Sequence, residues 1–177
     1  STTEELLLWR EATTIFMTSG HGGCHPVGLA LAAVDEGFSS EVWVNRAFPL
    51  FTDGVRTAHK KAIVEVVEQG FLDEAERKQI PVTISEWKME SVDSLLEEGA
   101  AVMCLISTYA LDKKKAPHWV TLTASDQRCF YIHDPDPEAF EGQAVEYQHI
   151  PVAREDFTRL VSYGRRKVRA IVIVRQA

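Results

Sequence analysis

The sequence predicts an α+β fold, in which a helical lobe packs against a mostly antiparallel sheet. Over roughly the first hundred residues, apolar side chains recur mainly at helical spacing, as at Val27, Leu31 and Val34. After residue 100, short runs of β-branched and aromatic residues separated by turn residues dominate. The sequence shows no repeat, low-complexity tract or linker. We therefore expect one domain over residues 1–177, which is long enough to bury a full core.

The N-terminal half is expected to hold four helices and two short strands. A capping-box pattern at residues 2–5 opens the first helix, and a glycine-rich turn over residues 20–25 separates it from the second, which begins at Pro26 and ends at Gly37. A long helix follows over residues 55–79, with Gly70 as a candidate break point, and a short one over residues 92–99. The strands are expected at residues 41–44 and 81–85. The apolar faces are assigned to Leu6, Trp9, Thr13 and Phe16 in the first helix, Val27, Leu31, Val34 and Phe38 in the second, and Val55, Ala62 and Val66 in the third.

The C-terminal half is expected to supply the sheet. Residues 101–106 are apolar on both faces and predict a buried central strand. Residues 117–123 and 129–135 flank a short polar turn and predict a hairpin. An edge strand is expected at residues 145–148, a helix at 154–162, and a core strand at 168–174.

Composition excludes several classes of protein. A formal net charge of −7 argues against nucleic acid as the main partner. No apolar run reaches the roughly twenty residues of a membrane span, and no signal peptide is visible. Three widely spaced cysteines, an odd number, do not make a disulfide framework, so a reducing cytoplasmic setting is expected. Nothing in the sequence calls for a cofactor.

His118 and Asp134 are the first candidate catalytic residues. They stand at the start of one hairpin strand and the end of the other, so they are expected nearly opposite each other, within hydrogen-bond reach. A carboxylate in that position orients an imidazole and stabilises its charged form, as a base acting on a nucleophile requires. The alternative is an edge histidine beside a turn aspartate.

Cys24 is the candidate nucleophile. It precedes the helix that starts at Pro26, where unpaired N–H groups favour a thiolate, and His21 or His25 could add positive charge. An accessible thiol with a lowered pKa is therefore expected; the alternative is a small residue that closes a tight turn. A zinc site of His21, Cys24 and His25 is disfavoured, because Cys24 and His25 are adjacent and a fourth ligand is missing, so we expect no metal.

At residues 118–120 and 133–135 the chain resembles the C39 family of cysteine peptidases, and more closely the bacterial peptidase C39-like proteins. The resemblance covers most of the chain. It implies a papain-like fold, a peptide or protein substrate, His118 as general base and Asp134 as its orienting group. It also implies a Gln followed by a Cys-Gly-Pro motif in an earlier helix, and this sequence has no such segment.

Three functions follow from that departure. The first is a cysteine peptidase domain, in which either this chain lacks the first helix with its nucleophile or Cys24 has taken over the nucleophile's role; in the former case a longer parent chain, with room for a fused domain, is expected. The second is an inactive papain-like module that only grips a peptide. The third is acyl transfer to an amine, which the same Cys-His-Asp arrangement serves. Because the family's nucleophile and its oxyanion-hole Gln have no match here, the chain as given is expected to hydrolyse peptides poorly or not at all.

Overall fold

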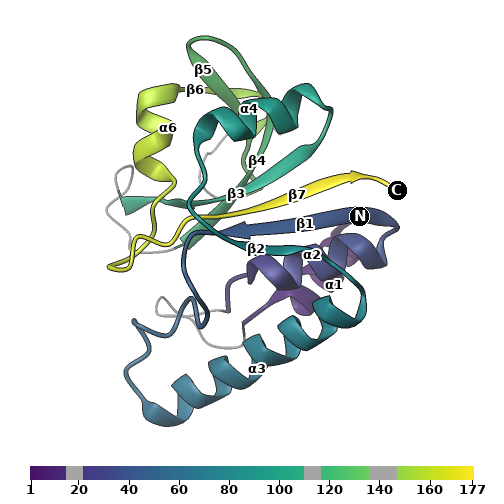
Figure 1. Ribbon diagram of the computed structural model, residues 1–177, viewed down its shortest axis with the longest axis vertical. Coiled ribbons are helices and arrows are strands. Elements are labelled where there is room, and N and C mark those ends of the chain that lie inside the picture. Colours follow the sequence, from purple (N-terminus) through teal and green to yellow (C-terminus); the bar gives the residue numbers. More distant parts are fainter. Residues whose placement is uncertain (15–21, 110–116, 136–146) are drawn as a thin grey trace.

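A computed structural model describes residues 1–14, 22–109, 117–135 and 147–177, and these form one sheet with helices on both faces (Figure 1). The helices of the described residues are α1 (Thr2–Ala12), α2 (Pro26–Asp35), α3 (Ala58–Arg77), α4 (Met89–Glu97) and α6 (Arg154–Leu160). The strands are β1 (Phe38–Val44), β2 (Val82–Ile84), β3 (Ala101–Ser107), β4 (Pro117–Ser125), β5 (Cys129–His133), β6 (Ile150–Ala153) and β7 (Ala170–Gln176). None of the described helices has both the length and the apolar character needed to cross a membrane.

The sheet is mostly antiparallel, as predicted. Its strand order is β2-β1-β7-β3-β4-β5-β6, and among the described strands only β1 and β2 pair in parallel. The expected hairpin is present as β4 and β5, and β3 is a central strand between β7 and β4. β7, the last strand in chain order, lies between β1 and β3, so that Val172 pairs with both Val42 and Met103.

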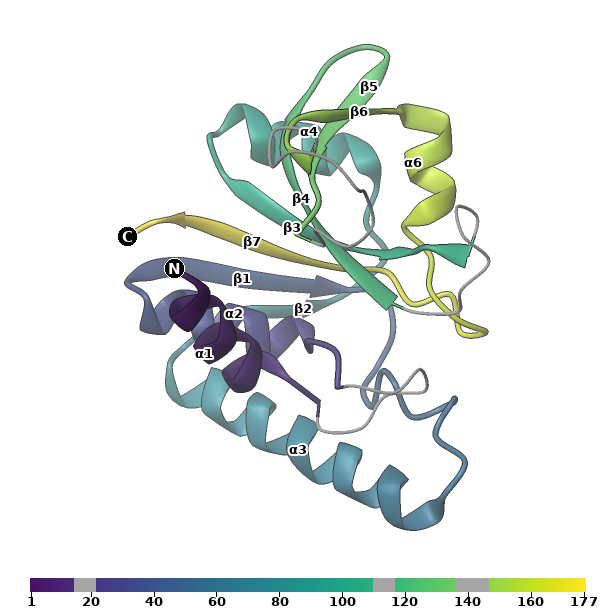
Figure 2. The ribbon, with the colours of Figure 1, turned by 180° about the vertical axis from the view of Figure 1, so that it is seen from behind.

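Each face of the sheet covers its own core, and the two cores define two lobes. The helical lobe comprises α1, α2 and α3, whose core includes Val27, Leu31 and Ala75. The sheet lobe comprises β3 to β6 with α4 and α6, and its core includes Val92 and Phe157. Figure 2 shows α1, α2 and α3 gathered on one side of β1 and β7, with α4 and α6 on the other. Side chains alternate along the central strands and reach both cores.

The first helix is shorter and more exposed than predicted. Ser1, rather than a later residue, caps it, and its hydroxyl and Glu4 form the capping box. The helix ends at Ala12, before Thr13 and Phe16, and the apolar side chains of Leu6 and Trp9 are 55% and 44% exposed. Phe16 lies outside the described residues.

The long helix buries a different face from the one predicted. Val66 is 72% exposed and Ala62 is exposed, whereas Val64, Glu68 and Ala75 point inward. Val55 precedes the helix, which continues through Gly70 without a break. The physical reason is Glu68, whose buried carboxylate occupies the central inward position of the helix. The prediction depended on the spacing of apolar residues, which does not mark a buried Glu as inward.

Two further boundaries differ from the prediction. Phe38 begins β1 instead of extending the second helical face, because Gly37, at φ 88°, ends the helix before it. The expected edge strand at 145–148 is not found at Tyr147 and Gln148, and its first half lies outside the described residues. The edge strand is β6 instead, where Pro151 is tolerated because an edge position needs fewer ladder hydrogen bonds.

Gly28 marks a close approach of α1 and α2. A Cβ atom at this position would lie 2.8 Å from the carbonyl oxygen of Ala12 and 2.9 Å from its Cα. We expect Gly28→Ala to lower the free energy of unfolding by about 1–3 kcal/mol in urea titrations, because backbone atoms must move. Gly70→Ala is the matched control: with nothing within 4 Å, it is expected to stabilise by about 0.5–1 kcal/mol. Equal effects at the two positions would contradict the role of the contact.

Candidate active site

The candidate site is at the open end of the β4–β5 hairpin. His118 is the second residue of β4, and Asp134 directly follows β5. The Nε2 atom of His118 lies 2.7 Å from Oδ1 of Asp134, which confirms the predicted contact. The two residues are offset along the hairpin and not directly opposite, because His133, at the end of β5, pairs with Thr121. Their side chains are 21% and 15% exposed, so solvent screens the pair only partly.

The hydrogen bond defines which ring nitrogen can act as a base. A carboxylate only accepts hydrogen bonds, so in the neutral ring the proton is on Nε2 and the lone pair is on Nδ1. Nδ1 has no hydrogen-bond partner among the described residues. The backbone N–H of Asp134 donates to the carbonyl of Tyr147 at 2.9 Å and holds the aspartate in place. The arrangement presents an oriented imidazole whose Nδ1 can accept a proton.

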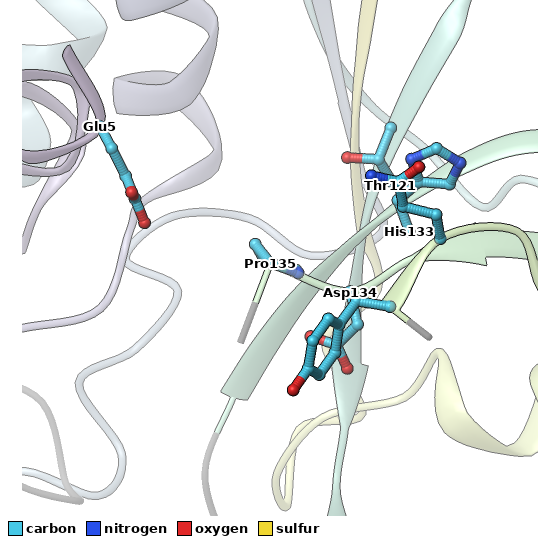
Figure 3. Close-up of a pocket in the computed structure, with 7 residues that line it drawn as sticks. Glu5, Thr121, His133, Asp134 and Pro135 are labelled. Carbon is cyan, nitrogen blue, oxygen red and sulfur yellow. The ribbon is translucent and has the colours of Figure 1, made fainter. Parts of the chain in front are cut away.

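A hollow of about 340 Å³ reaches the pair at its carboxylate. Figure 3 shows Glu5, on α1, across an open space from Pro135 and Asp134. One wall therefore belongs to the helical lobe and the other to the hairpin and the segment at Tyr147. Sequence patterns do not predict this wall, because α1 and the hairpin are over a hundred residues apart in the chain. The lining residues are Glu5, Thr121, His133, Asp134, Pro135, Tyr147 and Gln148.

Cys24 differs from its prediction. It is half-buried, and burial raises the pKa of its thiol to about 11, so the expectation of a thiol with a lowered pKa is wrong. Its thiol makes no hydrogen bond to His118 or to any other described residue. Its backbone forms an antiparallel bridge with Thr13, and its carbonyl accepts a hydrogen bond from Trp119 Nε1 at 3.0 Å. Cys24 thus lies on the Trp119 side of β4. His118 is the residue next to Trp119, and adjacent side chains of a strand point to opposite faces of the sheet.

His25 does not supply positive charge to Cys24, so this part of the prediction is wrong. Its ring is fully buried, Nδ1 accepts from the N–H of Val27 at 3.2 Å, and Nε2 lies 2.9 Å from Oε2 of Glu68. Burial lowers the pKa of this imidazole, which is therefore neutral near pH 7. Both nitrogens are engaged, so His25 is not available as a zinc ligand. His21 lies outside the described residues, within which no three His, Cys, Asp or Glu side chains are grouped to hold a metal.

The other two cysteines are also poorly placed as nucleophiles. Cys104 is fully buried, and burial raises the pKa of its thiol to about 12. Cys129 begins β5 beside the hairpin turn, whereas His118 is at the open end. At roughly 3.3 Å per residue, the hairpin measures about 20 Å from its turn to its open end, and this length separates Cys129 from His118.

A helical lobe, a mostly antiparallel sheet and a His–Asp pair at the end of a hairpin together define a papain-like α+β fold. The pattern that describes the Peptidase_C39 like family matches residues 1–175, and the chain therefore belongs to this family. Membership identifies a peptidase-like domain. No curated protein and no solved structure matches the chain.

Proposed function

We propose that this domain carries the general base of a cysteine peptidase, with His118 as the base and Asp134 as the group that orients it. The observation that carries the proposal is the 2.7 Å contact between His118 Nε2 and Asp134 Oδ1, which leaves Nδ1 to accept a proton, in a chain of the Peptidase_C39 like family. The hollow beside Asp134 supplies space for an extended peptide between α1 and the hairpin.

The proposed reaction proceeds in two halves. Nδ1 of His118 takes the proton of a cysteine thiol, and the sulfur attacks the peptide carbonyl carbon. The C–N bond then breaks, and the imidazolium returns its proton to the leaving amine. Water, deprotonated by the same imidazole, hydrolyses the thioester and regenerates the thiol. Throughout, the carboxylate of Asp134 stabilises the imidazolium and holds the ring in one orientation.

We further propose that the nucleophilic cysteine lies outside the 177 residues. This sequence contains three cysteines: one is fully buried, one is at the far end of the hairpin, and Cys24 has a raised pKa and contacts the Trp119 side of β4. A nucleophilic thiol would meet His118 at Nδ1, the ring nitrogen that Asp134 does not engage.

Alkylation of the natural protein with iodoacetamide, followed residue by residue by mass spectrometry, tests this. A thiol paired with an imidazole reacts at pH 5.5, because the ion pair stabilises the thiolate. We expect fast labelling there at one cysteine outside residues 1–177, lost in His118→Ala. Cys24 should be slow even near pH 8, since a pKa of about 11 leaves about 100-fold less thiolate than the ordinary thiol value of 9.0.

Two results would overturn the proposal. One is fast acidic labelling of Cys24 that depends on His118, which would make Cys24 the nucleophile. The other is a natural protein in which no cysteine reacts at pH 5.5, which would favour a module that binds peptides without cleaving them. Cys24→Ser is the matched control and is expected to leave the acidic labelling unchanged.

A further inference from the structure

The helical lobe contains a buried polar pair that the proposed reaction does not use. His25 and Glu68 are 0% and 3% exposed, and their side chains are 2.9 Å apart. Glu68 also accepts the backbone N–H of Leu50 at 2.9 Å on the same oxygen, Oε2. One carboxylate therefore joins the start of α2, the middle of α3 and the loop between β1 and α3.

The His25 ring is fixed in both position and orientation. It stacks on Phe71, with ring centroids 5.4 Å apart, and meets Phe51 edge-on at 5.8 Å. Its Nδ1 caps α2 by accepting the N–H of Val27. Well-packed apolar side chains of similar volume often serve stability as well as a buried charged pair does. Hydrogen bonds differ from apolar contacts in having a direction, so this network specifies where the start of α2 lies.

The backbone beside His25 passes this position on to the sheet. Around the bridge between Thr13 and Cys24, the N–H of Thr14 donates to Gly23 and the N–H of His25 donates to Ala12. These bonds hold Cys24 from both sides and leave its carbonyl to accept from Trp119 Nε1 at 3.0 Å. Trp119 packs on the helical-lobe core, and it is the neighbour of His118 in β4.

We propose that Glu68 and His25 are positioning residues for His118: through the Cys24 carbonyl and the Trp119 indole, they set the place of β4 relative to the helical lobe. The inference rests on the proposed function, because the position of the lobe matters only if His118 meets a thiol across the space between the lobes. The path from α3 to β4 consists of four residues in direct contact: Glu68, His25, its chain neighbour Cys24, and Trp119.

Trp119→Phe is the sharpest test, because it removes the indole N–H and keeps an aromatic ring in the core. At pH 5.5, we expect iodoacetamide labelling of the nucleophilic cysteine to be at least tenfold slower, or absent. The reason is that a displacement of about 1 Å between reacting groups can lower the reaction rate about 100-fold. With a peptide that the natural protein cleaves, kcat should fall while KM changes little. The NMR signal of the His118 Nε2–H should persist, because the contact with Asp134 is within the hairpin.

Three further variants separate positioning from stability. Trp43→Phe removes another indole N–H, which donates to Glu41 in β1, and should leave acidic labelling unchanged. Glu68→Gln keeps an oxygen that can accept from His25 and Leu50, and should retain most of the labelling. Glu68→Leu fills the space without an acceptor and should lose it. Melting temperatures are measured on each variant, and labelling is compared only well below them.

The outcomes distinguish the inference from the proposed function. Acidic labelling that is absent from the wild-type natural protein overturns the proposed function and the inference with it. Acidic labelling that is present in the wild type and unchanged in Trp119→Phe and Glu68→Leu overturns the inference alone. Loss in Trp119→Phe and Glu68→Leu, with retention in Glu68→Gln and Trp43→Phe, supports it.

Discussion

His118→Ala is expected to lower kcat/KM for peptide hydrolysis by the natural protein by about two to four orders of magnitude. Among the described residues, the imidazole of His118 is the only one held by a carboxylate with a ring nitrogen left to accept a proton, and positioned proton transfer contributes on that scale. The measurement is steady-state kinetics with any peptide that the protein cleaves. Circular dichroism and the melting temperature verify that the variant is folded.

Asp134→Asn provides the matched comparison. Asparagine can still accept the Nε2–H of His118, but it lacks the charge that stabilises the imidazolium, so an intermediate loss of rate is expected. Thr123→Ala, on the same hairpin and away from the pair, should leave the rate unchanged. Activity within about threefold of wild type in His118→Ala would contradict the assignment of the base.

Glu68→Ala is expected to lower the free energy of unfolding by about 2–5 kcal/mol, because each buried donor left without its acceptor costs about 1–3 kcal/mol. Here two donors lose their acceptor, the Nε2–H of His25 and the N–H of Leu50. Urea denaturation followed by tryptophan fluorescence gives the change.

Glu65→Ala is the control on the exposed side of the same helix, where a change within about 0.5 kcal/mol is expected. The double variant His25→Phe with Glu68→Leu replaces both partners by apolar groups and should recover much of the loss. If Glu68→Ala costs no more than Glu65→Ala, the pair contributes nothing to stability.

Local patterns in the sequence were sufficient to predict the elements in which the spacing of apolar residues agrees with the positions of the turn and glycine residues that end them. The hairpin, the buried strand β3 and the glycine that ends α2 were predicted for this reason. The buried face of α3 was not, because it depends on Glu68, whose partner His25 is 43 residues away in the chain. The period of apolar residues carries no information about a carboxylate that is buried because a distant imidazole binds it.

The site shows the same division between local and distant information. His118 and Asp134 share one hairpin, so their contact could be predicted from spacing around a turn. Cys24 could not be assessed in this way. Its place before a helix suggested a lowered pKa, but the fold buries the thiol and fills the helix start with the His25 ring, and the pKa rises. Burial of a single side chain is set by the whole tertiary structure.

The central place of β7 has a consequence for synthesis on the ribosome. Phe38 pairs with Gln176, so β1 gains its antiparallel neighbour β7 only after almost all of the 177 residues have been translated. Until then β1 and β3 each present an open edge, and the two lobes have no strand between them. β7 also contributes Ile171 and Ile173 to one core and Ala170 and Val172 to the other. The nascent chain thus has no defined spacing between its lobes, and the hollow bounded by both lobes forms only once β7 has been translated.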